Sequence, residues 1–297
     1  GSPKQKVPIG QITRIGATRT FSLSHKFLDN PVSGSTYTVT MDVADDDDPL
    51  NPVSISRLLT VNNVQPSFGG NALVLPVTEI TEGGSIALNV NFIDPGQEVH
   101  TVIVDWGDGT PVTTVNVALG ISTTAGLLHR YNNALGNSTV YTILASVFDR
   151  ETSVALANSA SMPVAVLNVT PTVLPVQLSP PGPVQEGDEV VISGFFTDSA
   201  VGEFYSAMVN WGDGTSSAAV VDQETRSYTA THRYLDDPIA ADDLYPIGVA
   251  VYDGVQTGLQ STVVEVRNVA PKLAVLPLVD TTASNPVFRA IASDVSQ

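Results

Sequence analysis

A seven-residue segment that occurs twice constrains the fold of this chain more than any other feature. Residues 104–110 (VDWGDGT) return about 105 residues later as 209–215 (VNWGDGT). A histidine followed two positions later by an aromatic residue keeps the same spacing at residues 25–27, 129–131 and 232–234. Self-similarity at a fixed period is the signature of a repeat architecture. The chain therefore contains copies of one unit of about 100 residues.

The same register aligns three segments that begin with tyrosine and end with aspartate: residues 37–45 (YTVTMDVAD), 141–149 (YTILASVFD) and 245–253 (YPIGVAVYD). In each segment apolar residues tend to alternate with others, which predicts a half-buried β-strand. Long stretches of helix-forming residues with helical periodicity are missing, and strand and turn formers dominate. Short strands separated by turns in a unit of this size predict an all-β chain of antiparallel sandwiches.

Each repeat closes with an Asn-Val-x-Pro segment, at residues 63–66, 168–171 and 268–271. Proline donates no ladder hydrogen bond and restricts the residue before it, so these segments are predicted linkers. They divide the chain into a partial C-terminal repeat (1–65), two complete repeats (66–170 and 171–270) and a partial N-terminal repeat (271–297).

These motifs, in this order, resemble the polycystic-kidney-disease (PKD) domain. That family has a Trp-x-Phe-Gly-Asp-Gly-like turn, a His-x-Tyr pair and a tyrosine-led strand ending in aspartate; here the turn is shortened to residues 106–109 (WGDG). The resemblance implies tandem immunoglobulin-like, PKD-type β-sandwiches in an elongated array. It also implies a spacer or interaction module of a large surface protein, and some PKD-like domains bind calcium near their linkers.

Composition limits both the partners that the chain can bind and the compartment in which we expect it. Thirteen Lys and Arg against 30 Asp and Glu give a net charge of −17, which repels nucleic acid and anionic membrane surfaces. Without cysteine the chain has neither disulfides nor thiolate zinc sites, which favours a microbial surface protein. No apolar run is long enough to span a membrane, so we expect an extracellular or cell-surface segment whose export signal or anchor lies elsewhere.

The recurring motif residues are predicted to be structural. Trp106 and Trp211 should be core residues, and Asp108 and Asp213 should stabilise their own glycine-rich turns. His129 and His232 recur as part of the fold motif, and no nucleophile elbow accompanies them, so we expect no enzyme activity.

A second set of polar residues is predicted to gather at the linkers. In an immunoglobulin-like sandwich the second and sixth strands end at the pole where the preceding linker enters, and a Glu-Gly turn of one repeat faces the next linker. The predicted metal ligands are Asn63, Asp94 and Asp149 at the first linker and Glu82, Asn168, Asp198 and Asp253 at the second. Oxygen ligands from two repeats and their linker suit Ca²⁺. The alternative is that these aspartates are solvated turn residues that end strands.

The two ends of the sequence correspond to complementary parts of one repeat. Residues 1–3 align with residues 109–111, and residues 288–294 align with residues 88–94. An arbitrary cut through a longer array explains this arrangement. Alternatively, the last strands of one molecule complete the first repeat of another, which would form a head-to-tail homopolymer.

Two functions fit these observations. The first is a structural or adhesive stalk or filament, whose partners are other repeats of the same protein, cell-surface or matrix proteins, or polysaccharide. The second is an accessory substrate- or carbohydrate-binding module of a large secreted hydrolase, which requires exposed aromatic residues. With aromatic residues at 6% and both tryptophans assigned to cores, the first is favoured.

Overall fold

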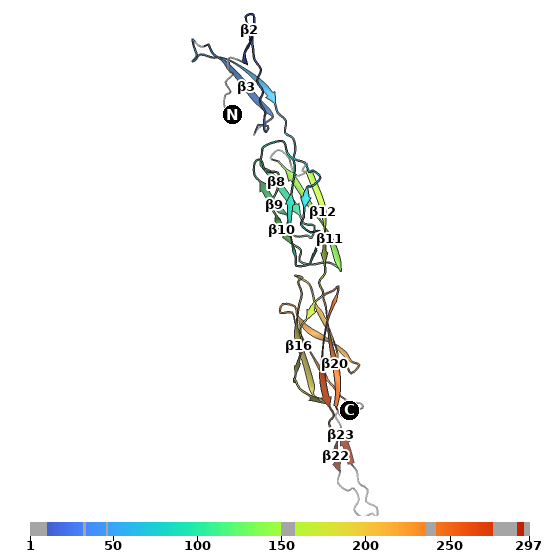
Figure 1. Ribbon diagram of the computed structural model, residues 1–297. Coiled ribbons are helices and arrows are strands. Elements are labelled where there is room, and N and C mark those ends of the chain that lie inside the picture. Colours follow the sequence, from blue (N-terminus) through green and yellow to red (C-terminus); the bar gives the residue numbers. More distant parts are fainter. Residues whose placement is uncertain are drawn as a thin grey trace, which may run out of the picture. The chain divides into compact units, whose positions relative to one another are not determined.

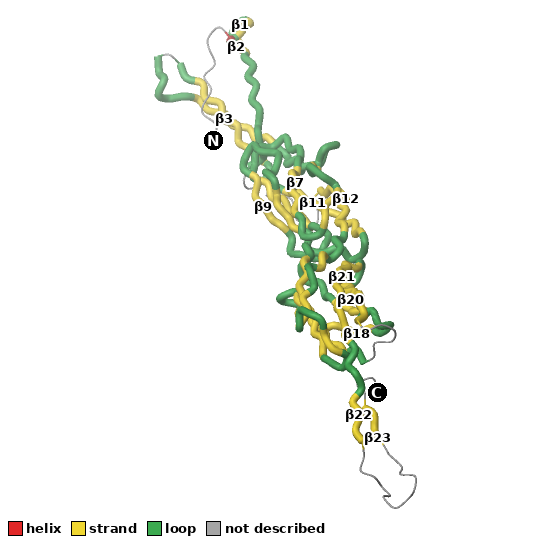
Figure 2. The backbone as a smooth tube through the Cα atoms, turned by 60° about the horizontal axis from the view of Figure 1, so that its bottom comes forward, coloured by secondary structure: helices red, strands yellow, loops and turns green. Residues whose placement is uncertain are grey.

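The computed structural model describes residues 11–31, 34–45, 47–149, 158–235, 242–275 and 290–293 (Figure 1). These residues form strands and loops without an α-helix (Figure 2), which confirms the all-β prediction. The chain has two compact units: unit 1 comprises Gly1–Val74, Leu88–Leu127 and Ile143–Met162, and unit 2 comprises Leu75–Ala87, Leu128–Thr142 and Pro163–Gln297. The four-part division expected from the repeats stays a prediction.

Unit 1 begins with two antiparallel strand pairs. Strand β1 (Thr13–Ile15) pairs with β2 (Thr18–Thr20), and β3 (Thr36–Val43) pairs with β4 (Val53–Thr60). In the β3–β4 register Met41 lies opposite Ile55, so apolar residues of both strands share one face. Along these two strands every side chain is exposed except that of Tyr37, which is half-buried.

The second repeat forms a sandwich in which the strands β7, β10, β11 and β12 each contain residues of both units. One sheet has the order β10-β7-β5: β10 (Leu127–Arg130), β7 (Ser85–Val90) and β5 (Leu73–Val74). The other has the order β6-β12-β11-β8-β9: β6 (Glu79–Thr81), β12 (Asn158–Leu167), β11 (Ser138–Phe148), β8 (His100–Asp105) and β9 (Thr113–Val117). Strand β8 pairs antiparallel with β9 and β11, whereas β6 pairs parallel with β12.

The third repeat lies in unit 2 and follows the same plan. Its strands are β13 (Thr172–Val173), β14 (Gln177–Ser179), β15 (Val184–Gln185), β16 (Glu189–Thr197), β17 (Ser206–Asn210), β18 (Ser216–Asp222), β19 (Ser227–Arg233), β20 (Asp242–Tyr252) and β21 (Thr257–Arg267). Strand β18 pairs with β17 and then with β19, so it passes from one layer to the other. Strand β15 pairs parallel with β21, as β6 does with β12. A last ladder joins β22 (Lys272–Val275) to β23 (Ala290–Ser293). The repeats are tandem immunoglobulin-like β-sandwiches.

The two tryptophans are the largest buried side chains, as predicted. Trp106 is 0% exposed and Trp211 is 1% exposed. Each indole N–H donates a 2.9 Å hydrogen bond to a hydroxyl on the next strand, Thr113 Oγ1 or Ser217 Oγ. The motif places a large apolar group in the core and also satisfies its one polar atom.

The His-x-aromatic motif forms a ladder of aromatic rings in all three repeats. In the first repeat the rings of His25 and Phe27 meet edge to face at 4.7 Å, and Phe27 lies 4.9 Å from Tyr37. The corresponding rings make the same two contacts in the other repeats: His129, Tyr131 and Tyr141, and His232, Tyr234 and Tyr245. The recurrence of this motif therefore has a packing explanation.

The predicted structural role of the turn aspartates is confirmed. Asp108 Oδ1 accepts hydrogen bonds from the amide and hydroxyl of Thr110, and Asp213 Oδ1 accepts the same two from Thr215. The flanking glycines of both turns have positive φ, which residues with a Cβ rarely adopt.

Candidate cation sites at the linkers

The asparagines of the first two linkers each bind the aspartate that follows the tyrosine-led strand of the next repeat. Asn63 Nδ2 donates to Asp149 Oδ2 at 2.8 Å within unit 1. Asn168 Nδ2 donates to Asp253 Oδ2 at 3.1 Å within unit 2. This interaction fixes the orientation of each amide, because the carboxylate accepts only from the nitrogen.

The valine after the linker asparagine is held by the preceding repeat. The Val169 amide donates to Glu82 Oε1 at 2.7 Å, and the Val269 amide donates to Glu186 Oε1 at 3.1 Å. Glu82 is only 1% exposed, and its second carboxylate oxygen accepts the Ala134 amide at 3.0 Å. Residues 168 and 169 thus make hydrogen bonds to both neighbouring repeats, and we call this arrangement the linker clasp.

The His-Arg-Tyr motif positions the glutamate of the clasp. The carbonyl of Gly83 accepts from Arg130 Nε at 2.8 Å, and the Gly83 amide donates to the Tyr131 carbonyl at 2.7 Å. Gly83 also lies against the loop of residues 198–201, where a Cβ would overlap the Ser199 carbonyl oxygen. The Val201 amide in this loop donates to the Asn132 carbonyl at 2.9 Å.

Three carboxylates meet at this linker in unit 2. One oxygen from each of Glu82, Asp198 and Glu203 lies within 4.8 Å of the others. Asp198 Oδ2, Glu203 Oε2 and Asn168 Oδ1 are buried and have no hydrogen-bond partner. Buried oxygens without donors are costly unless a cation or water binds them. We call these residues, with Asp253, the second-linker cluster.

The electrostatics of the second-linker cluster favour a positive ligand. Burial, together with the neighbouring carboxylates of Glu82, Asp198 and Asp253, raises the pKa of Glu203 to about 7. Burial also raises the pKa of Asp198, although hydrogen bonds from the amides of Ala200 and Ser199 oppose the shift. A divalent cation would relieve both effects, because it stabilises the ionised carboxylates.

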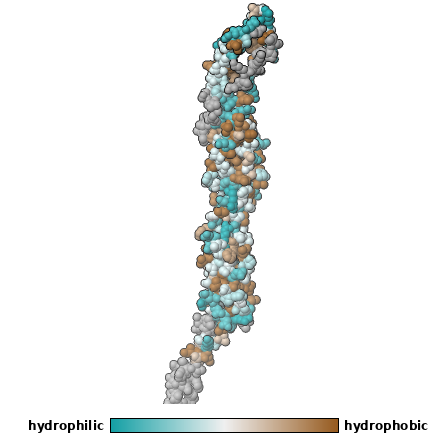
Figure 3. Space-filling model, turned by 90° about the vertical axis from the view of Figure 1, so that its left-hand side faces the viewer, coloured by the Kyte–Doolittle hydropathy of each residue, from teal (hydrophilic) through white to brown (hydrophobic). Residues whose placement is uncertain are grey.

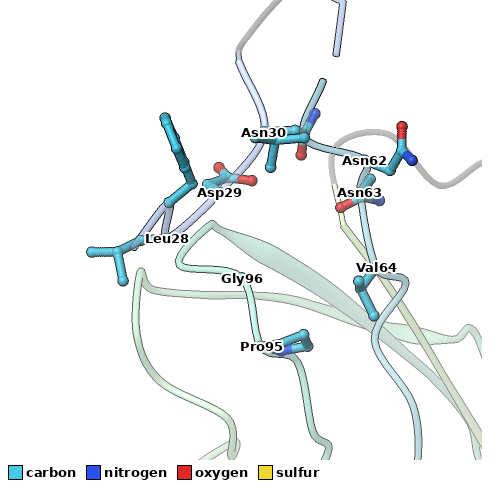
Figure 4. A pocket seen from close by; sticks show the side chains of 10 residues that line it. Leu28, Asp29, Asn30, Asn62, Asn63, Val64, Pro95 and Gly96 are labelled. Carbon is cyan, nitrogen blue, oxygen red and sulfur yellow. The ribbon is translucent and has the colours of Figure 1, made fainter. Parts of the chain in front are cut away.

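At the first linker Asn63 lines a small pocket of about 120 Å³ (Figure 4). Its lining includes Asp29 and Asn30 from the first repeat and Pro95 and Gly96 from the second. The Gln97 amide donates to the Leu28 carbonyl at 2.7 Å, which holds these two loops together. All of these residues belong to unit 1.

A group of three potential ligands follows directly in the sequence. Asp94, Glu98 and His100 each offer one atom within 4.8 Å of the others. Asp94 Oδ1 accepts the Gly96 amide at 2.6 Å, and its Oδ2 lies 3.1 Å from His100 Nε2. Glu98 is 3% exposed and His100 is 2% exposed. We call these three residues the first-linker cluster.

The structure brings the predicted residues together to different extents. Glu82 and Asp198 share the second-linker cluster, and Asn168 and Asp253 form its clasp, as described above. At the first linker Asn63 contacts Asp149, whereas the described contacts of Asp94 are with Gly96 and His100. Whether any of these residues binds a metal stays a prediction.

Glu98, His100 and Glu203 were missed by the sequence analysis. Glu98 and Glu203 lie at corresponding places in the two repeats, shortly after Asp94 or Asp198 and two residues before a ring. The sequence contains that recurrence. It does not show that each loop glutamate lies beside a carboxylate of the preceding repeat, which is what makes it a candidate ligand.

The histidines predicted to be structural have the expected surroundings where their contacts are described. His232 Nε2 lies 2.7 Å from Asp213 Oδ2, and its ring stacks on Trp211 at 4.7 Å. Burial would raise the pKa of Asp213, but hydrogen bonds from Thr215 and His232 outweigh it and hold that pKa below its usual value. The pair therefore links the turn to the aromatic ladder.

Comparisons with known proteins identify no family. No family model and no curated protein matches the chain. Among solved structures, the PKD domain of an M14-like peptidase from Thermoplasmatales archaeon SCGC AB-540-F20 has 16% identity and a TM-score of 0.25, and the match covers 36% of this chain and 99% of that one. A tetra-tandem repeat from the extending region of a large adhesion protein has 14% identity and a TM-score of 0.44, covering 87% and 70%. The amphioxus IgVJ-C2 molecule has 11% identity and a TM-score of 0.35, covering 63% and 98%.

At these identities and TM-scores the likenesses carry no functional argument, and the fold assignment rests on the strand pairing described above. Among the described residues, no helix is long and apolar enough to cross a membrane.

Proposed function

We propose that this chain is a non-enzymatic segment of an extracellular, cell-surface stalk or filament built from PKD-type repeats. Its role would be structural or adhesive. The linker clasp is the observation that most directly supports this proposal. A linker whose consecutive residues bind the repeat before and the repeat after is suited to transmit force and limit bending. Nearest-neighbour contacts of this kind are how repeat proteins gain stability.

A structural role also agrees with the histidine contacts. The Asp213 carboxylate binds His232, and the ring of His232 stacks on Trp211 and meets Tyr234 edge to face. A hydrolase built on these residues would need a nucleophile beside the imidazole. The interactions described for His232 serve packing, so we expect no hydrolase activity to depend on it.

We further propose that Ca²⁺ stiffens the linkers. The ligands would be the residues of the second-linker cluster and, at the first linker, Asn63, Asp94 and Asp149. The unpartnered oxygens of Asn168, Asp198 and Glu203 support this ligand set, since Ca²⁺ takes six to eight oxygens in flexible geometry. With the weak affinity typical of extracellular modules, about 2 mM calcium would stabilise a site by about 0.5–2 kcal/mol.

Thermal unfolding and small-angle scattering with and without about 2 mM calcium test this role. We expect a higher melting temperature and a narrower distribution of interdomain distances with calcium. Glu203→Gln should reduce both effects, whereas Glu79→Gln, an exposed residue of β6, should leave them unchanged. If calcium changes neither the melting temperature nor the scattering, the metal is removed from the proposal, and the linker clasp alone remains as the stiffening feature.

Head-to-tail assembly is the second part of the proposal. On β3 and β4 the apolar face carries exposed Val39, Met41 and Ile55, at 47%, 38% and 50%. The residues that correspond to Val39 and Met41 in the other two repeats are at most 1% exposed: Ile143 and Ala145 on β11, and Ile247 and Val249 on β20. A second copy that supplies strands equivalent to β13 and β16 would cover this face. Residues 1–3, 288, 289 and 294, which belong to the segments whose alignment suggested such complementation, lie outside the described residues.

The alternative is an accessory module of a secreted hydrolase. Exposed aromatic residues exist, with Phe204 at 77% and Phe195 at 57%. On the face shown in Figure 3, hydrophobic and hydrophilic residues are interspersed. Retention of the chain on insoluble polysaccharide, lost in a Phe204→Ala variant, would favour the accessory module over the stalk.

A further inference from the structure

The two linker clusters differ in one ligand-bearing side chain. His100 and Tyr205 follow Glu98 and Glu203 by two residues, and each ring packs on a preceding phenylalanine. The ring centroids of Phe92 and His100 are 4.7 Å apart, and those of Phe196 and Tyr205 are 4.8 Å apart; both pairs are tilted by 57°. The rings therefore have the same packing role, but only His100 adds a nitrogen that can bind a metal.

We propose that the first-linker cluster is a site for a zinc-class divalent ion, bound by Asp94, Glu98 and a ring nitrogen of His100. This deepens the proposed cation role of the linkers, since it assigns Asp94 of the first linker to a transition metal in place of calcium, whereas the second linker keeps calcium. The described ligands of the second-linker cluster are all oxygens, which suits calcium. Imidazole with carboxylates suits zinc and its neighbours in the first transition row.

The state of the imidazole supports a metal ligand. His100 is 98% buried, and its Nδ1 has no hydrogen-bond partner, while Nε2 lies 3.1 Å from Asp94 Oδ2. In neutral histidine one ring nitrogen carries the proton and the other carries a lone pair. With the ring proton on Nδ1, the lone pair of Nε2 points toward Asp94 Oδ2, and an ion between these two atoms would bind both.

The loop at Gly96 leaves room for an ion. A Cβ placed on Gly96 would lie 3.0 Å from Asp94 Oδ1, 3.2 Å from Glu98 Oε1 and 3.9 Å from Asp29 Oδ1. Three carboxylates from two repeats therefore surround a space that glycine keeps open. Asn30, which is 93% buried, has an unpartnered Oδ1 in the adjoining pocket, where Figure 4 shows its amide beside Asp29 and Asn63.

An entry path is present on the same loop. Glu98 and Asp29 line an open groove of about 580 Å³ together with Asp149. Among the described residues that line this groove, the charged ones are Asp29, Glu98 and Asp149, so an ion that arrives along it meets acidic side chains. A buried site with a satisfiable ligand set and an access route meets the requirements for a metal centre.

The test is isothermal titration calorimetry. A chelator first removes all metal from the full chain, and the metal-free chain is then titrated with zinc. We expect one zinc ion per chain, bound at least about 10-fold more weakly in His100→Phe, which keeps the ring packing but removes the nitrogen. Glu98→Gln should weaken zinc in the same way. The matched controls Tyr205→Phe, at the corresponding ring of the third repeat, and His232→Gln, at a histidine outside the cluster, should bind zinc as the wild type does.

Zinc binding of unchanged affinity in both His100→Phe and Glu98→Gln, or no zinc binding by the wild type, would overturn the proposal. If the variants do not fold, NMR spectroscopy of the wild type replaces them. A shift of the His100 ring resonances on addition of zinc supports the site, and unchanged resonances reject it. Glu203→Gln separates this proposal from the calcium role. If the chain binds zinc but its stability and scattering do not respond to calcium, only the calcium role is rejected. If it responds to calcium but does not bind zinc, only the zinc site is rejected.

Discussion

The buried tryptophans are the residues on which each sandwich core depends most. Trp211 is 1% exposed, and its contacts include His232 and the Ser217 hydroxyl. Trp211→Ala should lower the free energy of unfolding by about 3–5 kcal/mol, because it leaves a cavity that the rigid sheets cannot fill. Denaturant unfolding measures this loss. Phe204→Ala, at a side chain 77% exposed, is the control and should stay within about 0.5 kcal/mol of wild type.

Asp213 should give the third repeat an acid-dependent stability. Its pKa is lowered in the folded state, so the ionised carboxylate contributes stability above the unfolded pKa of 3.8, and that contribution is lost as the pH falls below this value. Asp213→Asn should therefore be less stable than wild type at neutral pH, with a difference that narrows below about pH 4. Glu189→Gln is the control on the exposed surface. A difference that stays constant from neutral to acid pH would contradict the role assigned to the His232 pair.

At the scale of elements, the linker clasp makes the second linker part of two sandwiches. Glu82→Ala should destabilise the chain by about 2–4 kcal/mol, because the amides of Ala134 and Val169 both lose their carboxylate acceptor. Chemical denaturation measures the effect, and Glu79→Ala on the neighbouring strand should be near neutral. Equal effects of the two substitutions would show that the clasp does not contribute to stability.

At the scale of the whole molecule, net charge and exposed apolar surface act in opposite directions on self-association. A charge of −17 repels other copies, whereas the apolar face of β3 and β4 favours association. Size-exclusion chromatography over a concentration series should therefore show association that increases when salt screens the charge. Ile55→Asp, on the apolar face, should abolish it, while Thr38→Asp on the opposite face should not. A monomer at every concentration and salt would eliminate head-to-tail assembly.

The all-β class, the sandwiches, the core tryptophans and the turn aspartates could all be predicted because each follows from local chemistry that the chain repeats. Alternation produces strands, a tryptophan in an alternating strand goes inside, and glycines flanking an aspartate make a tight turn. Two independent copies of such a pattern leave few other folds that bury the same residues. The sequence therefore determined what each repeat looks like.

Only the tertiary structure decided what surrounds the linkers. Asp94 and Asp198 were predicted ligands, but Glu98 and His100 became candidates because the fold buries them beside Asp94, and Glu203 because it lies beside Glu82 of the preceding repeat. Likewise, β3 and β20 have similar apolar patterns, yet Val39 is 47% exposed and Ile247 is 0% exposed. Burial depends on which neighbouring strands pack against a face, and a pattern within one strand contains no information about that neighbour.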